Sequence, residues 1–444
     1  MTKDGGVHWE IVTPRLTAAG VPQNAWVSWI ELSRHDPLRI YITLDHHTTG
    51  DHSTYLIRSM DGGKNWEAMR SAEFTGFAHR IKEDPVKKEL LFLGTEMGLF
   101  ASLDAGQNWF RMKNQIPEYA LVRDIQIQES KSALVVGTHG RGIYVIDDLR
   151  PLRSMSQALA EQNVVLLNDE RYELTSGKYG GGINLSGEWY AGNPEDISPF
   201  RYYFKNKLLK GEVKVEVLDM NGKVIQNLNA SNRKGINKVF WNQRMKPGRV
   251  AEGGTKPDFS GFGAPKVLPG IYQFKLMLGN ETLLDTFELI HVDRHDYKLA
   301  DRNLQYEVAM KYYFMHEQLA RTVQEINDKQ TKLKESLNLV KSKHHKKKIE
   351  SYHADLESLR STLLATKHKS VFADEEQLRE RISEAYSGVA WQEQRPSNLV
   401  IDRSVQLQLE VDAAEKSKNE IINKHDKEFL KIIKKEKLTL SNNP

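Results

Sequence analysis

The chain of 444 residues contains no cysteine, which excludes disulfide bonds and thiol chemistry. The absence fits a reducing cytosol and fits equally well an exported protein without disulfides, so it does not decide between them. No apolar run approaches 18 residues, so the sequence predicts no membrane span. The N-terminus also lacks the charged and then apolar pattern of a signal peptide.

Strong charge of one sign is missing too. The formal net charge is +4, which is too small for this length to indicate a nucleic-acid partner. No glycine-rich loop is followed by a helix of the kind that binds phosphates. A nucleophile elbow is also absent. The sequence therefore predicts no cofactor, while 39% hydrophobic and 27% charged residues are typical of a folded protein.

What the chain does contain is an eight-residue pattern, S/T-x-D-x-G-x-x-W, in copies that begin at Thr2, Ser59 and Ser102. The Asp can accept bonds from backbone N–H groups two residues on, the Gly allows positive φ, and the Trp covers the turn. The last two copies begin 43 residues apart, a spacing typical of a four-stranded propeller blade. We assign a structural role to nine residues of these boxes: Asp4, Gly6, Trp9, Asp61, Gly63, Trp66, Asp104, Gly106 and Trp109.

Two runs outside the boxes also repeat. Leu91–Phe100 and Leu134–Ile146 share an apolar run, then Gly-Thr, a further glycine and a second apolar run. With the boxes, these runs resemble the BNR-repeat (Asp-box) propellers, which include sialidases, xyloglucanases and the luminal domain of sortilin. The resemblance is strongest to bacterial glycosyl-hydrolase-like or sortilin-like proteins of this group. It implies boxes that lie away from the active face and an exported protein, periplasmic or extracellular.

The sequence pattern divides the chain into four regions. We expect propeller blades at 1–150, a connector at 151–200, an immunoglobulin-like β-sandwich at 201–295 and a helical bundle at 296–444. The sandwich region has period-two strands and resembles the domains of the flagellar hook-capping protein. The helical region has apolar residues every three or four positions and a reversal across Lys341–Lys348, which predicts a coiled-coil hairpin. The fold class is therefore mainly β with an α C-terminus.

The propeller predicted here is partial. Only about three blades are visible, whereas closed rings have at least four. We therefore expect the chain to be the C-terminal portion of a longer protein. Open blade edges invite strand addition, so the chain should self-associate or bind an upstream polypeptide that completes the ring. The alternative is that the connector or the helices cover these edges.

Arginines provide the candidate ligand site. Arg80 and Arg123 each lie 14 residues after a box tryptophan, where an innermost strand should begin. We expect both to face one axis and bind a carboxylate or phosphate, because the guanidinium is a planar bidentate fork. Sialidases use such an arginine cluster. The alternative is that each pairs with a nearby carboxylate such as Asp84 or Asp124. His139 and Arg141, in a glycine-rich turn between strands, are further candidates.

The sequence offers no recognisable catalytic centre. The stretch from Asp45 to His52 holds metal-ligand residue types without zinc-motif spacing, so it predicts a solvated loop and no metal site. Glycoside hydrolysis needs two placed carboxylates, and no such pair can be recognised. The sequence therefore predicts a non-catalytic binding or scaffold protein with a protein or glycan ligand. The alternative is a glycosidase-like hydrolase whose catalytic carboxylates lie in blades outside this chain.

Overall fold

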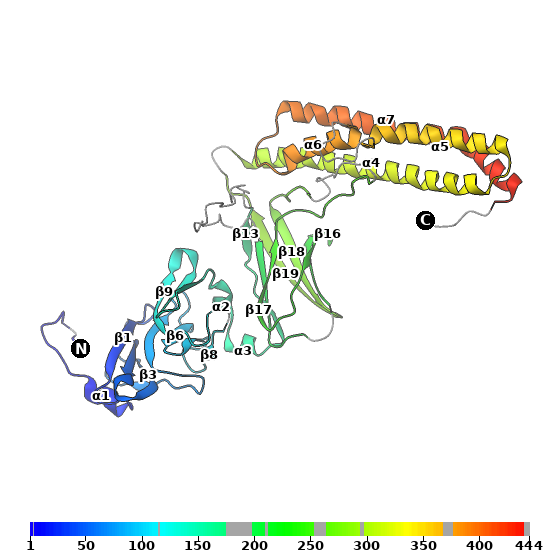
Figure 1. Ribbon diagram of the computed structural model, residues 1–444. Helices are drawn as coiled ribbons and strands as arrows, with labels where there is room; N and C mark the ends of the chain where they lie inside the picture. The colour runs from blue at the N-terminus through cyan, green and yellow to red at the C-terminus, as the bar shows by residue number, and fades with distance from the viewer. Residues whose placement is uncertain are drawn as a thin grey trace. The chain divides into compact units, whose positions relative to one another are not determined.

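The computed structural model describes residues 1–2, 4–113, 116–174, 198–208, 212–252, 263–293, 297–366 and 376–438. The chain forms two compact units, coloured along the sequence in Figure 1. The first contains residues 1–167, 201–209 and 232–237, and the second contains 168–200, 210–231 and 238–444. Part of the predicted connector, residues 175–197, lies outside the described residues.

The first unit contains three successive antiparallel sheets, each a meander in sequence order. The first strands of the three sheets lie beside one another, as in consecutive propeller blades. The prediction of a propeller-like N-terminal region is therefore confirmed. The strands of the three sheets are β1 Trp26–Leu32, β2 Ile40–His46, β3 Asp51–Ser59 and β4 Glu67–Ala68; β5 Ala78–Glu83, β6 Leu91–Thr95, β7 Gly98–Ser102 and β8 Phe110–Arg111; and β9 Val122–Gln128, β10 Ala133–Thr138 and β11 Ile143–Ile146.

Apolar side chains hold each blade against the next. Leu56 of the first blade belongs to the same buried cluster as Ile81 and Leu93 of the second. Leu99, on the opposite face of the second blade, is buried with Ile125 of the third. Because strand side chains alternate between the two faces of a sheet, a middle blade buries both faces.

Two segments outside the blades cover parts of the stack. Leu16, in helix α1 (Thr13–Ala18), packs on Ile42 of the first blade. Met155 follows helix α2 (Arg150–Ser154) and joins the core between the second and third blades, and helix α3 (Gln157–Ala160) comes next. Arg153 forms an ion pair of 2.9 Å with the fully buried Asp84. These contacts lie between the second and third blades, so the alternative that the connector covers the open edges of the stack stays a prediction.

The boxes form the turns between β3 and β4 and between β7 and β8. Gly62 N–H donates to the carbonyl of Leu38, so these turns share one end of the blades with the β1–β2 loop. We call this the box end. The hairpins β2–β3, β6–β7 and β10–β11 lie at the opposite end, together with the beginnings of β1, β5 and β9. We call that the hairpin end.

Hydrogen bonds within each box occupy its carboxylate. Asp61 Oδ1 accepts from the backbone N–H of Lys64 at 3.0 Å and of Asn65 at 2.9 Å. The sequence predicted a donor two residues on, but the donors lie three and four residues on. These bonds, above all the one from Asn65, lower the pKa of Asp61 to about 2. Trp66 Nε1 donates to the carbonyl of Gly63 at 3.1 Å.

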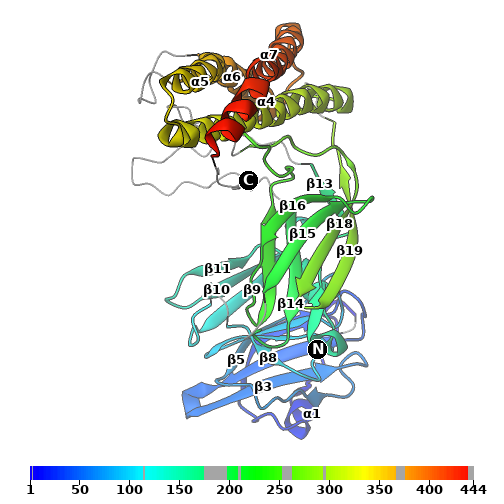
Figure 2. The same cartoon turned by 90° about the vertical axis from the view of Figure 1, so that its right-hand side faces the viewer.

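Two further sheets follow, with the orders β12-β14-β17 and β13-β19-β18-β15-β16. In the second unit the ring of Phe200 packs against Phe274 and Phe287 at centroid distances of 4.8 and 4.9 Å, so two sheets face each other. Figure 2 shows β15, β18 and β19 side by side. The strands are β12 Val164–Leu166, β13 Arg171–Glu173, β14 Ser198–Phe204, β15 Val213–Asp219, β16 Val224–Asn229, β17 Gly235–Trp241, β18 Gly270–Leu278 and β19 Glu281–Ile290.

The C-terminal region is helical, as predicted. The reversal comes earlier than expected: Ser342 Oγ accepts from the N–H of His345 and caps the second helix, so the lysine run forms its first turn. Carboxylates of α7 then offset this basic N-terminus, with Glu436 2.6 Å from His345. None of the described helices has the length and apolar character needed to cross a membrane. The four helices are α4 Leu299–Leu339, α5 Lys343–Leu363, α6 Leu378–Ala390 and α7 Asn398–Glu436.

Candidate functional site

The first strand of each blade carries an irregularity at the same place near the hairpin end. The ladder to the second strand skips one residue: Ser28 in β1, His79 in β5 and Arg123 in β9. A bulge of this kind leaves a residue without a ladder partner and re-aims its side chain, and bulges are frequent beside binding sites. Because β1, β5 and β9 are neighbours, the three residues form a row across the blades. We call it the bulge row.

Two members of the bulge row are hydrogen-bonded to each other. Arg123 Nη1 lies 3.2 Å from His79 Nδ1. A guanidinium only donates, so Nδ1 accepts and the neutral imidazole carries its proton on Nε2. Burial, followed by the charge of Arg123, lowers the pKa of His79 to about 4. His79 is therefore neutral at pH 7, and Arg123 is the cation of the row.

The next position on the three strands forms a second row. The guanidinium carbon of Arg80 lies 3.1 Å from the ring centre of Trp29, and its Nε lies 3.2 Å from Asp124 Oδ1. Arg80 is 5% exposed. Its cation–π and ion-pair contacts join all three blades, which matches the expected alternative that this arginine pairs with a nearby carboxylate. Any ligand contact by Arg80 stays a prediction.

Register explains why the two arginines differ. β6 pairs Gly94 with Arg80, and β10 pairs the matching Gly137 with Asp124. Asp124 is therefore the equivalent of Arg80, and Arg123 is the equivalent of the residue before it. The sequence prediction placed both arginines on adjacent inner strands, which is right, but aligned them wrongly. The segment from the box tryptophan to this position is one residue longer in the third blade.

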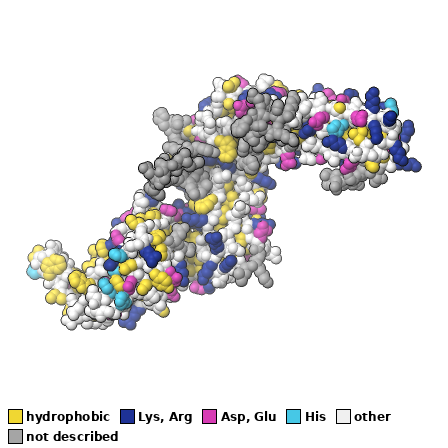
Figure 3. Space-filling view, in the orientation of Figure 1, with side chains coloured by type: hydrophobic (Ala, Val, Ile, Leu, Met, Phe, Trp, Pro, Cys, Tyr) yellow, Lys and Arg dark blue, Asp and Glu magenta, His cyan; other side chains and the backbone are white. Residues whose placement is uncertain are grey.

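An aromatic group adjoins the bulge row. The rings of His47 and Phe77 stack at 4.3 Å, and Phe77 meets His79 edge-on at 4.8 Å. His47 opens the 3₁₀ turn His47–Thr49, so this stretch is less a solvated loop than the sequence suggested. The sequence reasoning missed Phe77; its only signal was an aromatic residue directly before an inner strand. Figure 3 shows histidines beside hydrophobic side chains on this unit.

Carboxylates near the aromatic group are already paired. Asp45 lies 2.6 Å from His47, and Glu96 lies 3.0 Å from His52. Within the described parts of the chain, no group of three or more His, Asp or Glu side chains is arranged to hold a metal ion. The surroundings of the bulge row are thus aromatic and imidazole rings and carboxylates that contact histidines.

His139 and Arg141 lie in the β10–β11 hairpin, and both are exposed. The N–H of His139 donates to the carbonyl of Leu121 at 2.8 Å, so this hairpin lies beside the start of β9, where Arg123 follows. Gly140 and Gly142 have φ of 72° and 82°, which the tight turn requires. Among the described residues, neither of the two cations Arg123 and Arg141 forms an ion pair with a carboxylate, and His139 has no carboxylate within ion-pair distance either.

A pocket of about 60 Å³ near the box end holds three carboxylates, Glu31, Glu83 and Glu129. Each has a cation: Lys82 lies 2.7 Å from Glu31, Arg39 lies 3.1 Å from Glu83, and Arg34 pairs with Glu129. Glycoside hydrolysis needs one carboxyl group with a raised pKa. Wherever the pKa of a described carboxyl group is clearly shifted, it is lowered. The pocket is therefore a salt-bridge network.

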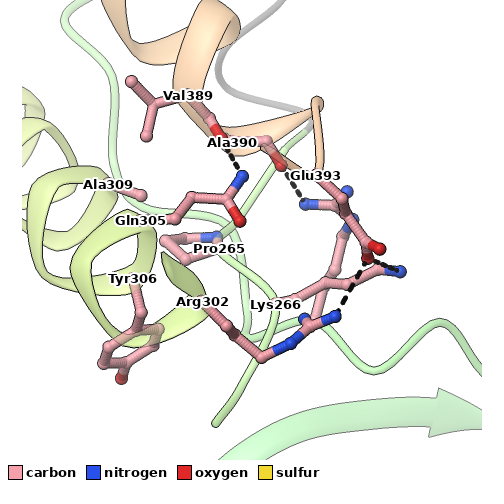
Figure 4. A pocket seen from close by; sticks show the side chains of 10 residues that line it. Pro265, Lys266, Arg302, Gln305, Tyr306, Ala309, Val389, Ala390 and Glu393 are labelled. Carbon is pink, nitrogen blue, oxygen red and sulfur yellow. Dashed lines mark hydrogen bonds and ion pairs between the residues drawn. The ribbon is translucent and has the colours of Figure 1, made fainter. Parts of the chain in front are cut away.

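A smaller cavity of about 20 Å³ lies in the second unit, with room for about one water molecule. Figure 4 shows Lys266 and Arg302 directed toward Glu393, and Gln305 directed toward the backbone of Val389. Glu393 lies 2.8 Å from Lys266, and Gln305 Nε2 donates to the carbonyl of Val389 at 2.7 Å. Arg244 Nη1 donates to the carbonyl of Ala390 at 2.8 Å. These bonds fasten α4 and the end of α6 to the segment before β18.

Comparison with known proteins gives weak likenesses only. The chain is similar to the GH74 xyloglucanase from Xanthomonas campestris, with 12% identity and a TM-score of 0.23 over 59% of this chain and 36% of that chain. The Niastella koreensis GH74 enzyme is 12% identical with a TM-score of 0.24, over 62% of this chain and 48% of that chain. YCF48 from Cyanidioschyzon merolae is 13% identical with a TM-score of 0.18, over 60% of this chain and 73% of that chain. The chain spans about a third to a half of the two GH74 proteins. No protein-family model and no curated protein matches it. Likenesses of this size assign no function.

Proposed function

We propose that the chain is a non-catalytic binding protein, built on a BNR-repeat, sortilin-like propeller, that binds an anionic group at its hairpin end. One observation carries the proposal. Arg123, His139 and Arg141 have no carboxylate partner among the described residues, while neighbouring Asp45 and Asp124 are paired. Cations gathered at one end without counter-charges favour an acidic ligand.

The chemistry of the surface fits a carboxylate-bearing ligand. Arg123 uses one nitrogen on His79 and keeps further N–H donors, which suit the paired oxygens of a carboxylate. The stacked rings of His47 and Phe77 offer a flat apolar surface beside it. A flat surface of this kind packs against a sugar ring or an apolar side chain, so both a glycan and a protein ligand remain within the proposal, with the carboxylate as their shared feature.

Isothermal titration with two probes tests the proposal: a glutamate-rich peptide and an oligosaccharide that carries uronic or sialic acid. We expect binding of at least one probe, weakening with added salt as charge pairing does. Arg123→Gln and Arg141→Gln should each lower the affinity about tenfold or more, the scale of one lost charged hydrogen bond. Arg70→Gln, at another exposed arginine of the same unit, is the matched control. Equal loss in the control, or no binding, would reject the proposal.

No observation favours the hydrolase alternative, because the box-end carboxylates are each paired with a cation. We further propose an immunoglobulin-like character for the two-sheet region, supported by its resemblance to the flagellar hook-capping domains, and a coiled-coil hairpin for α4 and α5, supported by their apolar periodicity. The resemblance to BNR-repeat proteins supports a periplasmic or extracellular location.

A further inference from the structure

The first blade exposes apolar residues at positions that the other blades bury. Ile30 on β1 is 52% exposed, whereas its ladder equivalents Ile81 on β5 and Ile125 on β9 are both 0% exposed. The same holds for Val27 of β1, which is 49% exposed, whereas its ladder equivalent Ala78 on β5 is fully buried. We call Val27 and Ile30 the upstream face.

The third blade shows the mirror situation on its other face. Ile143 on β11 is 74% exposed, whereas its equivalents Leu56 on β3 and Leu99 on β7 are 1% and 0% exposed. Val145 is 48% exposed, and its equivalent Ala101 is fully buried. We call Ile143 and Val145 the downstream face.

Inside the stack, these two faces are partners. Leu56 of the first blade is buried with Ile81 of the second, and Leu99 of the second with Ile125 of the third. Each contact joins a residue equivalent to Ile143 with a residue equivalent to Ile30. The first and third blades thus expose the two halves of one blade–blade contact at opposite ends of the described stack.

The N-terminal segment leaves the upstream face accessible. Leu16 and Val21 cover the outer strands of the first blade. Met69 and Phe74, in the segment that leads from β4 to β5, occupy a comparable place between the first and second blades. A covering segment and a neighbouring blade therefore coexist inside the stack, and the same is possible at β1.

We propose that a second copy of this chain docks head to tail, with the downstream face of each protomer on the upstream face of the other. A contact between two different faces either closes into a ring or continues as a filament. Two copies bring together six blades, within the range of four to eight found in closed propellers. Closure buries both faces of both protomers, and it does not depend on the anion site.

Sedimentation velocity of the purified chain tests this proposal. We expect a dimer of the 50.9-kDa chain that Ile30→Glu and Ile143→Glu each convert to a monomer. Ile271→Glu changes a 54% exposed isoleucine of β18 and should leave the dimer intact, which controls for the added charge. Circular dichroism shows whether each variant is folded. Where Ile30→Glu does not fold, Val27→Ser and Val145→Ser replace the pair.

Mixing distinguishes a head-to-tail contact from a symmetric one. The Ile30→Glu protein keeps its downstream face and the Ile143→Glu protein keeps its upstream face, so an equimolar mixture should regain a weaker dimer through one intact contact. A dimer lost with Ile30→Glu but kept with Ile143→Glu would show a symmetric β1–β1 contact and overturn the proposal. A wild-type monomer, an open filament, or association that neither variant affects would overturn it as well.

Discussion

The three box tryptophans share one hydrogen bond and differ in burial. Nε1 of Trp9, Trp66 and Trp109 donates to the carbonyl of the box glycine at 3.0 to 3.1 Å in each case. Trp109 is 6% exposed and meets Phe74 edge-on at 5.2 Å, Trp66 is half-buried, and Trp9 is 74% exposed. Replacing each tryptophan by alanine therefore separates the contribution of its burial to stability from the contribution of its hydrogen bond in the turn.

Burial sets the expected magnitudes. Trp109→Ala should lower the free energy of unfolding of the first unit by about 3–5 kcal/mol, as for other buried aromatic side chains. Trp9→Ala should change it by less than about 0.5 kcal/mol, the usual size for an exposed position. Trp66→Ala should fall between the two, because part of its ring packs on the first blade.

Hydrogen exchange with mass spectrometry is the suitable assay, because it reads the two units separately. Peptides from β5–β7 should lose protection with Trp109→Ala, while peptides from the helices keep theirs, which serves as the internal control. Equal losses for all three variants would mean that the hydrogen bond decides the stability, and the reasoning from burial would be wrong.

Three more predictions follow from single contacts. Ala105 has φ of 59° where the other boxes have glycine, so Ala105→Gly should raise the stability of the first unit by about 1 kcal/mol and Gly62→Ala should lower it, as urea unfolding would show. Because the pKa of His79 is lowered to about 4 in the folded protein, the unfolded chain binds a proton at this residue more readily than the folded one between about pH 4 and 6.5. The free energy of unfolding should therefore fall as the pH drops through this window, and this pH dependence should vanish in His79→Gln. Ala251 lies in the core of the helices, and Arg379 donates to its carbonyl. A fragment of residues 296–444 should therefore be helical by circular dichroism, but it should melt at a lower temperature than a fragment of residues 246–444.

Much of the fold could be read from local patterns. The boxes repeat at blade length, and period two changes to a helical period near residue 299. These signals depend on neighbours in sequence, so they survive without tertiary information. The sequence placed the reversal between α4 and α5 within the lysine run, whereas α5 begins in that run. The start of α5 is fixed by the Ser342 cap and by carboxylates of α7 that pair with His345 and Lys348, and the α7 contacts are distant in sequence.

The candidate site depends on residues far apart in sequence. The lowered pKa of His79 comes from burial and from the charge of Arg123, 44 residues away on the next blade. Arg80 is held by contacts with Trp29 and Asp124 of the two adjoining blades. A bulge has no fixed sequence signature, so a count from the box tryptophan could identify the strands but not the register. Three-dimensional pairing was required to show which arginine faces a histidine and which one stacks on a tryptophan.

The bulge row has a consequence for how such blades change chemistry. Ser28, His79 and Arg123 are a hydroxyl, an imidazole and a guanidinium at one structural position, and the strand ladder continues on either side of each. A residue that the ladder skips has no directly opposite partner on the second strand, so the ladder itself does not constrain its side chain. Each blade therefore has one position at the hairpin end whose side-chain chemistry differs from blade to blade. If the proposed anion site is correct, single substitutions there should alter its ligand preference.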